Sequence, residues 1–377
     1  MTNITKSLHL VVFSLILSLS ACKKDTIDPT PEPTPTPTPS YTIPTTYTFS
    51  NADFTSSTKR IAMLGELTTY LRSTHTTTAA TQPTLNAQKL KDMYANAASV
   101  FSDASLNNSG LQLKDKTSNL FSFVSELELA FDDAELASSS SSANPTVTTA
   151  SSGVRGKLVS PARAVLVNAN GFEYKELAEK GIMGAVFYYQ AMTLLNTISG
   201  FDNSTSINNA TAQENAWDEA FGYFGVPVSF PTSTVGLKNW GSYCNSVNPA
   251  IGSNTLIMNA FLKGRAAISN KDNTARDAAK EIVVATWEKV AAAKCISYLK
   301  GAKNNLSDPA TLHHNMSEAY GFVTAFRYNT QKTITDDDIA TLLNYFGTNL
   351  FQLNAANLDL AIAKLEAVFA LNATLIP

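Results

Sequence analysis

His314 and Glu318 are the two residues whose types and spacing are best suited to chemistry. They stand four positions apart, a spacing that places both side chains on one face of a helix. Such a pair can supply two ligands to one metal ion, or it can form a buried hydrogen-bonded network that fixes helix packing. Both readings stay open on the sequence. The neighbouring His313 belongs to a different face, and we expect it to be exposed or to cap the helix.

The segment around Glu318 has a counterpart earlier in the chain, which adds Glu219 to the candidate ligands. Residues 217–224 (WDEAFGYF) recur 99 residues later as residues 316–323 (MSEAYGFV). Glu, Ala and Gly coincide, and every aromatic or apolar position keeps its character. A cluster of Glu219, Glu318 and His314 would be rich in oxygen ligands, which suits iron, manganese or zinc.

The recurrence predicts an internally duplicated unit of long helix, loop and short helix, at about residues 174–225 and 276–324. Duplicated units usually pack by pseudo-symmetry, so Glu219 and Glu318 should lie in related environments. Each short helix is apolar on one side and carries Glu on the other, so the carboxylate should be partly buried and should need a partner. The glycine three residues after each Glu leaves a notch that another backbone, a water molecule or a ligand can enter.

The elements that must position these residues are predicted to be helices. Apolar residues recur at three- and four-residue spacing from about Tyr47 onward, and strand-like alternation is short and rare. The predicted fold class is therefore all-α, a helical bundle. Two loops are expected, at the Ser- and Thr-rich residues 138–152 and at residues 226–254, anchored there by Trp240 and Tyr243. The helices are expected at residues 85–101, 111–136, 174–198, 278–299, 336–345 and 356–371.

The N-terminus predicts an anchor. Residues 8–19 form an apolar run too short to span a bilayer, as in a signal peptide. The residues that follow, Leu19-Ser20-Ala21-Cys22, resemble the lipobox of bacterial lipoproteins. That resemblance implies removal of residues 1–21 and lipidation of Cys22, which would hold the protein to a membrane.

The residues after Cys22 predict a destination and a spacer. The residue after the lipidated cysteine is Lys23 rather than the Asp that retains lipoproteins at the inner membrane. By the same resemblance, this implies an outer-membrane lipoprotein, facing the periplasm or the cell surface. Residues 22–46 are rich in Pro and Thr and favour an extended stalk. The helical domain is expected to cover residues 47–377.

The other two cysteines, Cys244 and Cys295, lie in the predicted helical domain. They could form one disulfide in an oxidising compartment, or they could be two separately buried thiols. Both alternatives stay open. Metal binding by these residues is not expected, because no CxxC or Cys/His cluster accompanies them.

Three stretches carry a family resemblance. Residues 180–190 (KGIMGAVFYYQ), 217–225 and 313–322 resemble an uncharacterised family of bacterial lipoproteins, a domain of unknown function, over nearly everything after the stalk. The chain also resembles, distantly, the imelysin-like proteins, which are duplicated helical bundles often associated with iron acquisition. Those proteins carry Gly-x-His-x-x-Glu. This sequence departs from that motif, because His314 is followed by Glu318 at four positions and Leu312 stands where the glycine would be.

Composition narrows the functional classes. The net charge is −3 and no stripe of Lys and Arg is interleaved with aromatics, so no nucleic-acid partner is expected. HExxH, GxSxG and phosphate-binding glycine loops are missing from the sequence. We therefore expect a membrane-anchored extracytoplasmic binding lipoprotein, in iron or other nutrient acquisition, with a divalent metal or iron as its ligand and an outer-membrane transport protein as its partner. The alternatives are an imelysin-like metallopeptidase and a purely structural envelope protein.

Overall fold

The computed structural model describes residues 40–77, 83–139 and 147–377. The expected signal peptide, Cys22 and the stalk up to residue 39 lie outside the described residues. Tyr41–Pro377 forms one compact unit, so residues 41–46 belong to the folded unit together with the helices. Within the described residues, no helix combines the length and the apolar character needed to cross a membrane.

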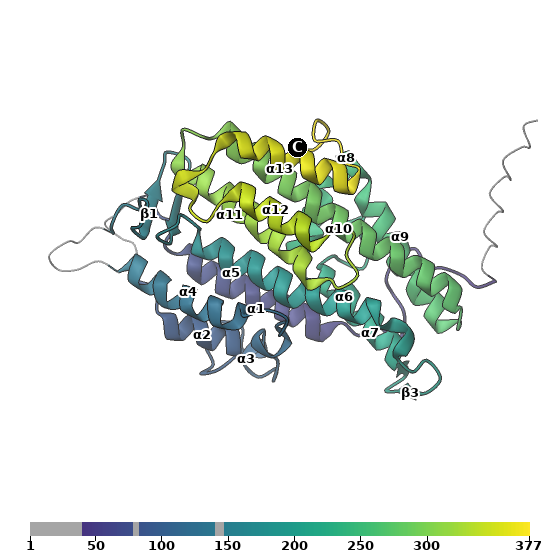
Figure 1. Ribbon diagram of the computed structural model, residues 1–377. Helices are drawn as coiled ribbons and strands as arrows, with labels where there is room; N and C mark the ends of the chain where they lie inside the picture. The colour runs from purple at the N-terminus through teal and green to yellow at the C-terminus, as the bar shows by residue number, and fades with distance from the viewer. Residues whose placement is uncertain (1–39, 78–82, 140–146) are drawn as a thin grey trace, which may run out of the picture. The chain divides into compact units, whose positions relative to one another are not determined.

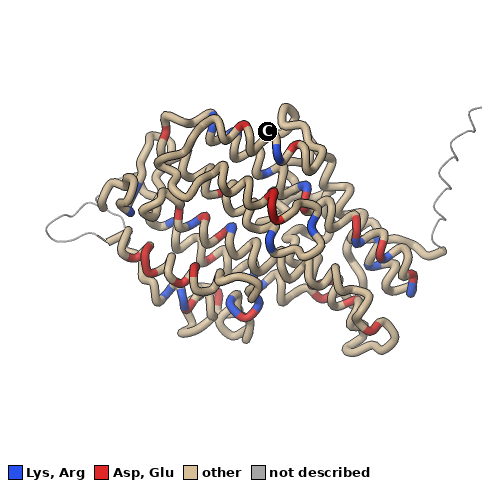
Figure 2. The backbone as a smooth tube through the Cα atoms, in the orientation of Figure 1, with Lys and Arg blue, Asp and Glu red and all other residues tan. Residues whose placement is uncertain are grey.

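The fold is all-α, as predicted. Five helices pack side by side, each in contact with the next (Figure 1). Their packing order is α2 (Ala87–Ala95), α4 (Phe123–Ser138), α5 (Tyr174–Ile182), α11 (Pro309–Ala325) and α10 (Asn273–Asn304). α1 (Thr55–Arg72) packs on α2 and α5, and the short α3 (Ala104–Asn107) packs on α1. The charged residues of both signs are interleaved along these helices (Figure 2).

Strands are a minor part of the described structure. β1 (Gly156–Val159) and β2 (Ala164–Val167) form an antiparallel hairpin that leads the chain into α5. β3 (Ser206–Ile207) and β4 (Ala210–Thr211) form a second, two-residue pairing before α7 (Ala212–Phe224). The first hairpin contacts α4 and α11, and its position matters because its turn borders the site described below.

The long helix expected over residues 174–198 is present, with one irregularity. α5 passes into a π-helical turn, Met183–Tyr188, before continuing as α6 (Tyr189–Asn196). The indole of Trp240 donates a hydrogen bond to the carbonyl oxygen of Met183 at 3.1 Å. A π turn widens the helix and disturbs its regular bonding, and here the Met183 carbonyl accepts a hydrogen bond from a side chain outside the helix.

The prediction of one long loop at residues 226–254 is wrong, because this segment is partly helical. It contains α8 (Asn239–Ile251), whose Trp240, Cys244 and Val247 are fully buried. Their four- and three-residue spacing is the signal of a helix, hidden among Gly, Pro and Asn. α9 (Ser253–Ser269) follows directly and packs on α8 and α10.

Two predicted helices are shorter than expected. α2 ends where Asn96 adopts a left-handed conformation, φ 48°, and α4 begins only at Phe123. The C-terminal helices agree with prediction within a residue or two, as α12 (Asp336–Phe346) and α13 (Ala355–Phe369), the latter capped by Asn354. Of residues 138–152, positions 140–146 lie outside the described residues.

The repeated segments are both helical, in α7 and α11, and each packs on the long helix before it. Their glycines face different neighbours. A Cβ on Gly222 would lie 2.0 Å from Oγ of Ser57, and one on Gly321 would lie 2.2 Å from Cβ of Lys180. The notches predicted beside the two Glu residues are therefore filled by α1 and α5 respectively. The duplication itself stays a prediction.

Candidate functional site

The N-terminal end of α5 carries a run of charged residues that turns into the protein interior. Glu173 is the N-cap residue and Glu176 lies in the first turn, and both are 0 % exposed. Acidic side chains are favourable at this end of a helix because the free backbone N–H groups give it a partial positive charge. Three-residue spacing keeps Glu173 and Glu176 on one side of the helix.

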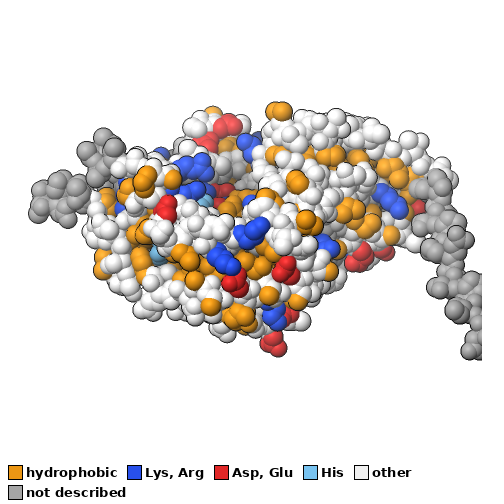
Figure 3. All heavy atoms as spheres, turned by 90° about the horizontal axis from the view of Figure 1, so that it is seen from above, with side chains coloured by type: hydrophobic (Ala, Val, Ile, Leu, Met, Phe, Trp, Pro, Cys, Tyr) orange, Lys and Arg blue, Asp and Glu red, His pale blue; other side chains and the backbone are white. Residues whose placement is uncertain are grey.

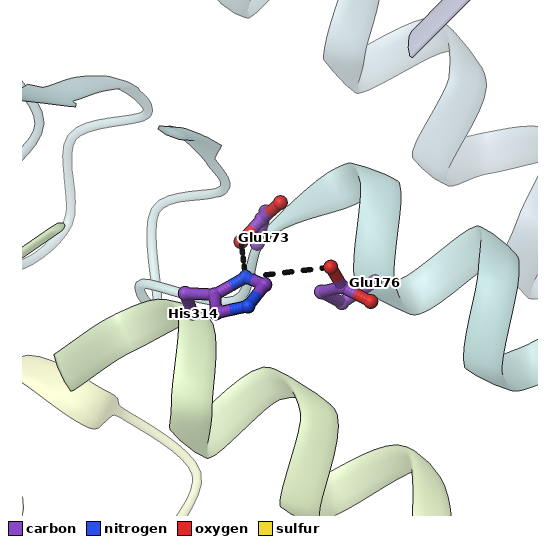
Figure 4. A group of neighbouring side chains, drawn as sticks. All are labelled: Glu173, Glu176 and His314. Carbon is purple, nitrogen blue, oxygen red and sulfur yellow. Dashed lines mark hydrogen bonds and ion pairs between the residues drawn. The ribbon is translucent and has the colours of Figure 1, made fainter. Parts of the chain in front are cut away.

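His314 reaches this side of α5 from α11 (Figure 4). Its Nδ1 lies 2.8 Å from Oε2 of Glu173 and 3.3 Å from Oε1 of Glu176. Its Nε2 lies 3.7 Å from Oε1 of Glu318, one turn further along α11. The imidazole therefore lies among three carboxylates, two from α5 and one from its own helix.

Glu173 also contacts a second histidine. Nε2 of His75, just after α1, lies 3.6 Å from the Oε1 atom of Glu173. The backbone N–H of Glu173 donates to Oγ of Ser317, which fixes the start of α5 against α11. One fully buried carboxylate thus lies between imidazoles from two separate parts of the chain.

Lysines balance the remaining carboxylates. Nζ of Lys180 lies 2.9 Å from Glu176 and 3.1 Å from Glu318. Nζ of Lys175 lies 2.6 Å from Glu176 and 2.5 Å from Glu179. Among the described residues, by contrast, the ion-pair partners of Glu173 are the two histidines and no Lys or Arg.

These contacts separate the proton affinities of neighbouring groups. Burial, and then the negative charge of Glu176, raise the pKa of Glu318 to about 7 in spite of nearby Lys180. Burial acts in the same direction on Glu176, but Lys180 and Lys175 outweigh it and hold its pKa well below the ordinary value. Burial also lowers the pKa of His75, which favours its neutral form. A neutral imidazole and an ionised carboxylate are the states in which these groups bind metals.

Three side chains have the geometry of a metal site. One donor atom each from Glu173, Glu176 and His314 lie within 4.8 Å of one another. A set of two carboxylates and one imidazole suits iron, manganese or zinc. The site opens to a cavity of about 550 Å³ that His75 and Glu318 also line. One face of the molecule shows basic side chains beside a histidine and acidic groups at a hollow (Figure 3).

Glu219 does not join this cluster. It lies half-buried on α7, 4.0 Å from Nζ of Lys116, and lines a separate pocket with Asn51 and Asp53. The corresponding positions of the two short helices face α1 and α5 respectively, so the expected cluster of Glu219 with His314 and Glu318 does not form. Glu173 and Glu176 are the carboxylates that contact His314, and neither was predicted from the sequence as a site residue. Their signal was a series of Glu at three-residue spacing, 173, 176 and 179.

The prediction for His313 is also wrong. It is 3 % exposed rather than exposed or capping, and its Nδ1 lies 2.8 Å from the carbonyl oxygen of Gly171. A Cβ on Gly171 would lie 2.4 Å from this ring, so the glycine allows the close approach. Hydrophobic contact with Phe351 covers the ring from another side.

The cysteines are two separate thiols in this structure. Cys244 and Cys295 are both free and fully buried. Sγ of Cys244 contacts Asn254, and Sγ of Cys295 contacts the carbonyl oxygen of Ala319. Of the two alternatives, the structure has the separately buried thiols, and burial raises the pKa of Cys244 to about 12, which suppresses thiolate reactivity.

Residues 44–349 match the family described as a domain of unknown function, DUF4856. The chain belongs to this family. Comparison with curated proteins and with solved structures found no match in either. The matched region includes both helices of the charged cluster, α5 and α11, and all three candidate metal ligands, Glu173, Glu176 and His314.

Proposed function

We propose that this protein binds a metal ion between α5 and α11, through Glu173, Glu176 and His314, as a membrane-anchored extracytoplasmic binding lipoprotein. Acquisition of iron or of another nutrient metal is the role we infer, at the outer membrane, with a transport protein there as partner. The lipobox-like Leu19–Cys22 segment supports the location, and the donor set supports the ligand.

The observation that carries the proposal is the environment of Glu173. A fully buried carboxylate costs several kcal/mol unless charge or hydrogen bonds compensate it. Lys175 and Lys180 compensate Glu176, whereas Glu173 contacts only the two imidazoles among ionisable groups of the described structure. A cation bound by Glu173, Glu176 and His314 would supply the missing charge.

The test is metal binding by the purified chain and three variants, measured by calorimetry with Mn²⁺, Zn²⁺ and Fe²⁺. Wild type should bind about one ion of at least one of them, and Glu173→Gln and His314→Ala should weaken that binding at least tenfold, because each removes a ligand. Glu219→Gln is the matched control, since Glu219 lies on the equivalent helix outside the cluster, and its affinity should equal that of wild type.

Two outcomes would contradict the proposal. Wild type that binds none of the three ions would leave the cluster a packing network, and His314→Ala would then lower thermal stability with no ligand involved. Equal loss in Glu219→Gln would show that binding is not at this site. Circular dichroism of each variant checks that the helices are intact.

A further inference from the structure

Two arginines line the same cavity as the charged cluster. Arg72 is the last residue of α1, and Arg163 follows the turn between β1 and β2. In residues 40–77, 83–139 and 147–377, neither guanidinium forms an ion pair or a side-chain hydrogen bond. This contrasts with Arg265, whose guanidinium pairs with Asp218 and Glu214 in the core.

The charge of the cavity makes these arginines unexpected for a site that takes a bare cation. Four carboxyl groups, Glu173, Glu176, Glu179 and Glu318, lie near three lysines, so the interior carries at most one net negative charge (four minus three), and less where Glu318 is protonated. A divalent ion would reverse that sign, and two guanidinium groups at the same cavity would add two further positive charges. The three lysines are Lys175, Lys180 and Lys294, the last of them acting on Glu318 through its charge.

Arginine recognises oxygen anions. Its planar guanidinium presents parallel N–H groups that match carboxylate or phosphate oxygens in a two-point contact. Three protein donors also leave coordination positions on a metal that an exogenous oxygen can occupy. The cavity, at about 550 Å³, is within the size range of small-ligand sites.

We propose that the cavity takes its metal together with a small oxygen anion, a carboxylate or a phosphate, held by Arg72 and Arg163. The ligand class is thus a metal–oxyanion complex. This inference rests on the proposed function, because the anion bridges from the arginines to the metal bound by Glu173, Glu176 and His314. Binding of the metal and of the anion must then be mutually reinforcing.

The experiment measures the dissociation constant of Mn²⁺ by electron paramagnetic resonance, with and without millimolar malonate or inorganic phosphate. Wild type should bind Mn²⁺ at least about fivefold more tightly with one of the anions, the lower end of typical coupling between sites. The arm that shows the effect identifies the anion as a carboxylate or a phosphate. In Arg72→Gln/Arg163→Gln the enhancement should vanish, while Mn²⁺ binding without anion should be no weaker than in wild type.

Arg327→Gln is the matched control, because Arg327 lines a different pocket beside Phe121, and it should keep the enhancement. Mn²⁺ binding that neither anion strengthens would overturn this inference and leave the metal site standing. Enhancement that persists in the double variant would overturn it too. Failure of Mn²⁺ to bind under any condition would overturn the metal site and this inference together.

Discussion

At the scale of single residues, Lys180 both packs against Gly321 and pairs with buried carboxylates. Its aliphatic stem fills the notch beside Gly321, and its ammonium group contacts Glu176 and Glu318. A long amphipathic side chain can bury its methylenes while its charge finds partners further out. The small residue on α11 therefore sets how deeply the lysine of α5 enters the helix interface, and with it the position of the buried carboxylates.

Gly321→Ala should destabilise the protein, because its new Cβ would overlap Cβ of Lys180, which is 2.2 Å away. Overpacking of this kind costs about 1–3 kcal/mol. Gly65→Ala is the control, since no atom lies within 4 Å of a Cβ on Gly65 in α1. That change should instead stabilise by about 0.5–1 kcal/mol, as alanine restricts the unfolded chain and favours helix. Urea unfolding of both variants gives the comparison, and a Gly321→Ala variant as stable as wild type would show that α5 and α11 can separate freely.

Part of the site could be predicted from the sequence, and the rest could not, for a physical reason. The pairing of His314 with Glu318 is a local property of helix spacing, and it is readable from four positions. The meeting of His314 with Glu173 joins residues 141 positions apart and depends on how α5 packs on α11. His75 comes from a third part of the chain, the segment just after α1. The alternation of Glu and Lys in residues 173–180 is ordinary on a solvated helix, so its burial is set by packing that no local pattern encodes.

At the scale of elements, one buried carboxylate ties the longest helix to the segment after α11. Glu288 of α10 accepts hydrogen bonds from the backbone N–H and Oγ of Thr333, at 3.0 and 2.7 Å, and from Nδ2 of Asn329 at 3.2 Å. Burial raises the pKa of Glu288, and these hydrogen bonds only partly oppose the rise.

Stability at this junction should therefore depend on pH. The folded state holds a proton on Glu288 up to a higher pH than the unfolded chain, whose carboxyl titrates near 4.5. The contribution of Glu288 to stability then falls as pH rises above about 4.5 and grows as pH is lowered toward it. Glu288→Gln lacks this titration. The unfolding free energy of wild type minus that of the variant, from urea curves between pH 7 and 5, should increase as pH falls, and a decrease would contradict the assignment.

The helical elements themselves were largely predictable, and the failures are instructive. Strong periodicity predicted the helices around α5, α10, α12 and α13, whereas α1, α8 and α9 were not among the predicted helix ranges. α8 was missed because Gly241 and Pro249 lie within it, and both residues are poor helix formers on average. Here burial of Trp240 outweighs local preference, since an indole removed from water stabilises more than a glycine costs.

At the scale of the whole molecule, the N-terminal residues of the compact unit are bound into its core. The ring of Tyr47 stacks on Phe221 at 3.7 Å between centroids, and its hydroxyl donates to Asp218. Arg265 pairs with the same aspartate and also donates to Asn51. A force applied to the chain at Tyr41 would therefore be transmitted to both α7 and α9 through these contacts.

Anchoring through Cys22 is the prediction that belongs to this scale. Cys22→Ser removes the sulfur that would carry lipid, so the protein should leave the membrane fraction or remain unprocessed. Fractionation and gel mobility of the wild type and the variant in the native host test this. Cys244→Ser is the control, because that thiol is buried in the domain and should not affect anchoring. A Cys22→Ser protein that fractionates and migrates like wild type would refute the lipobox interpretation.

The π turn at Met183–Tyr188 has a consequence for how this protein can change over generations. A single added residue in an α-helix rotates everything beyond it by about 100°, unless a wider turn absorbs the residue where it enters. Here α5, with its charged N-terminal end, and α6 lie on either side of that turn, and each keeps its own orientation. Insertions or deletions within it would swing one half against the other, so related chains should vary in residue type there and hold the length constant.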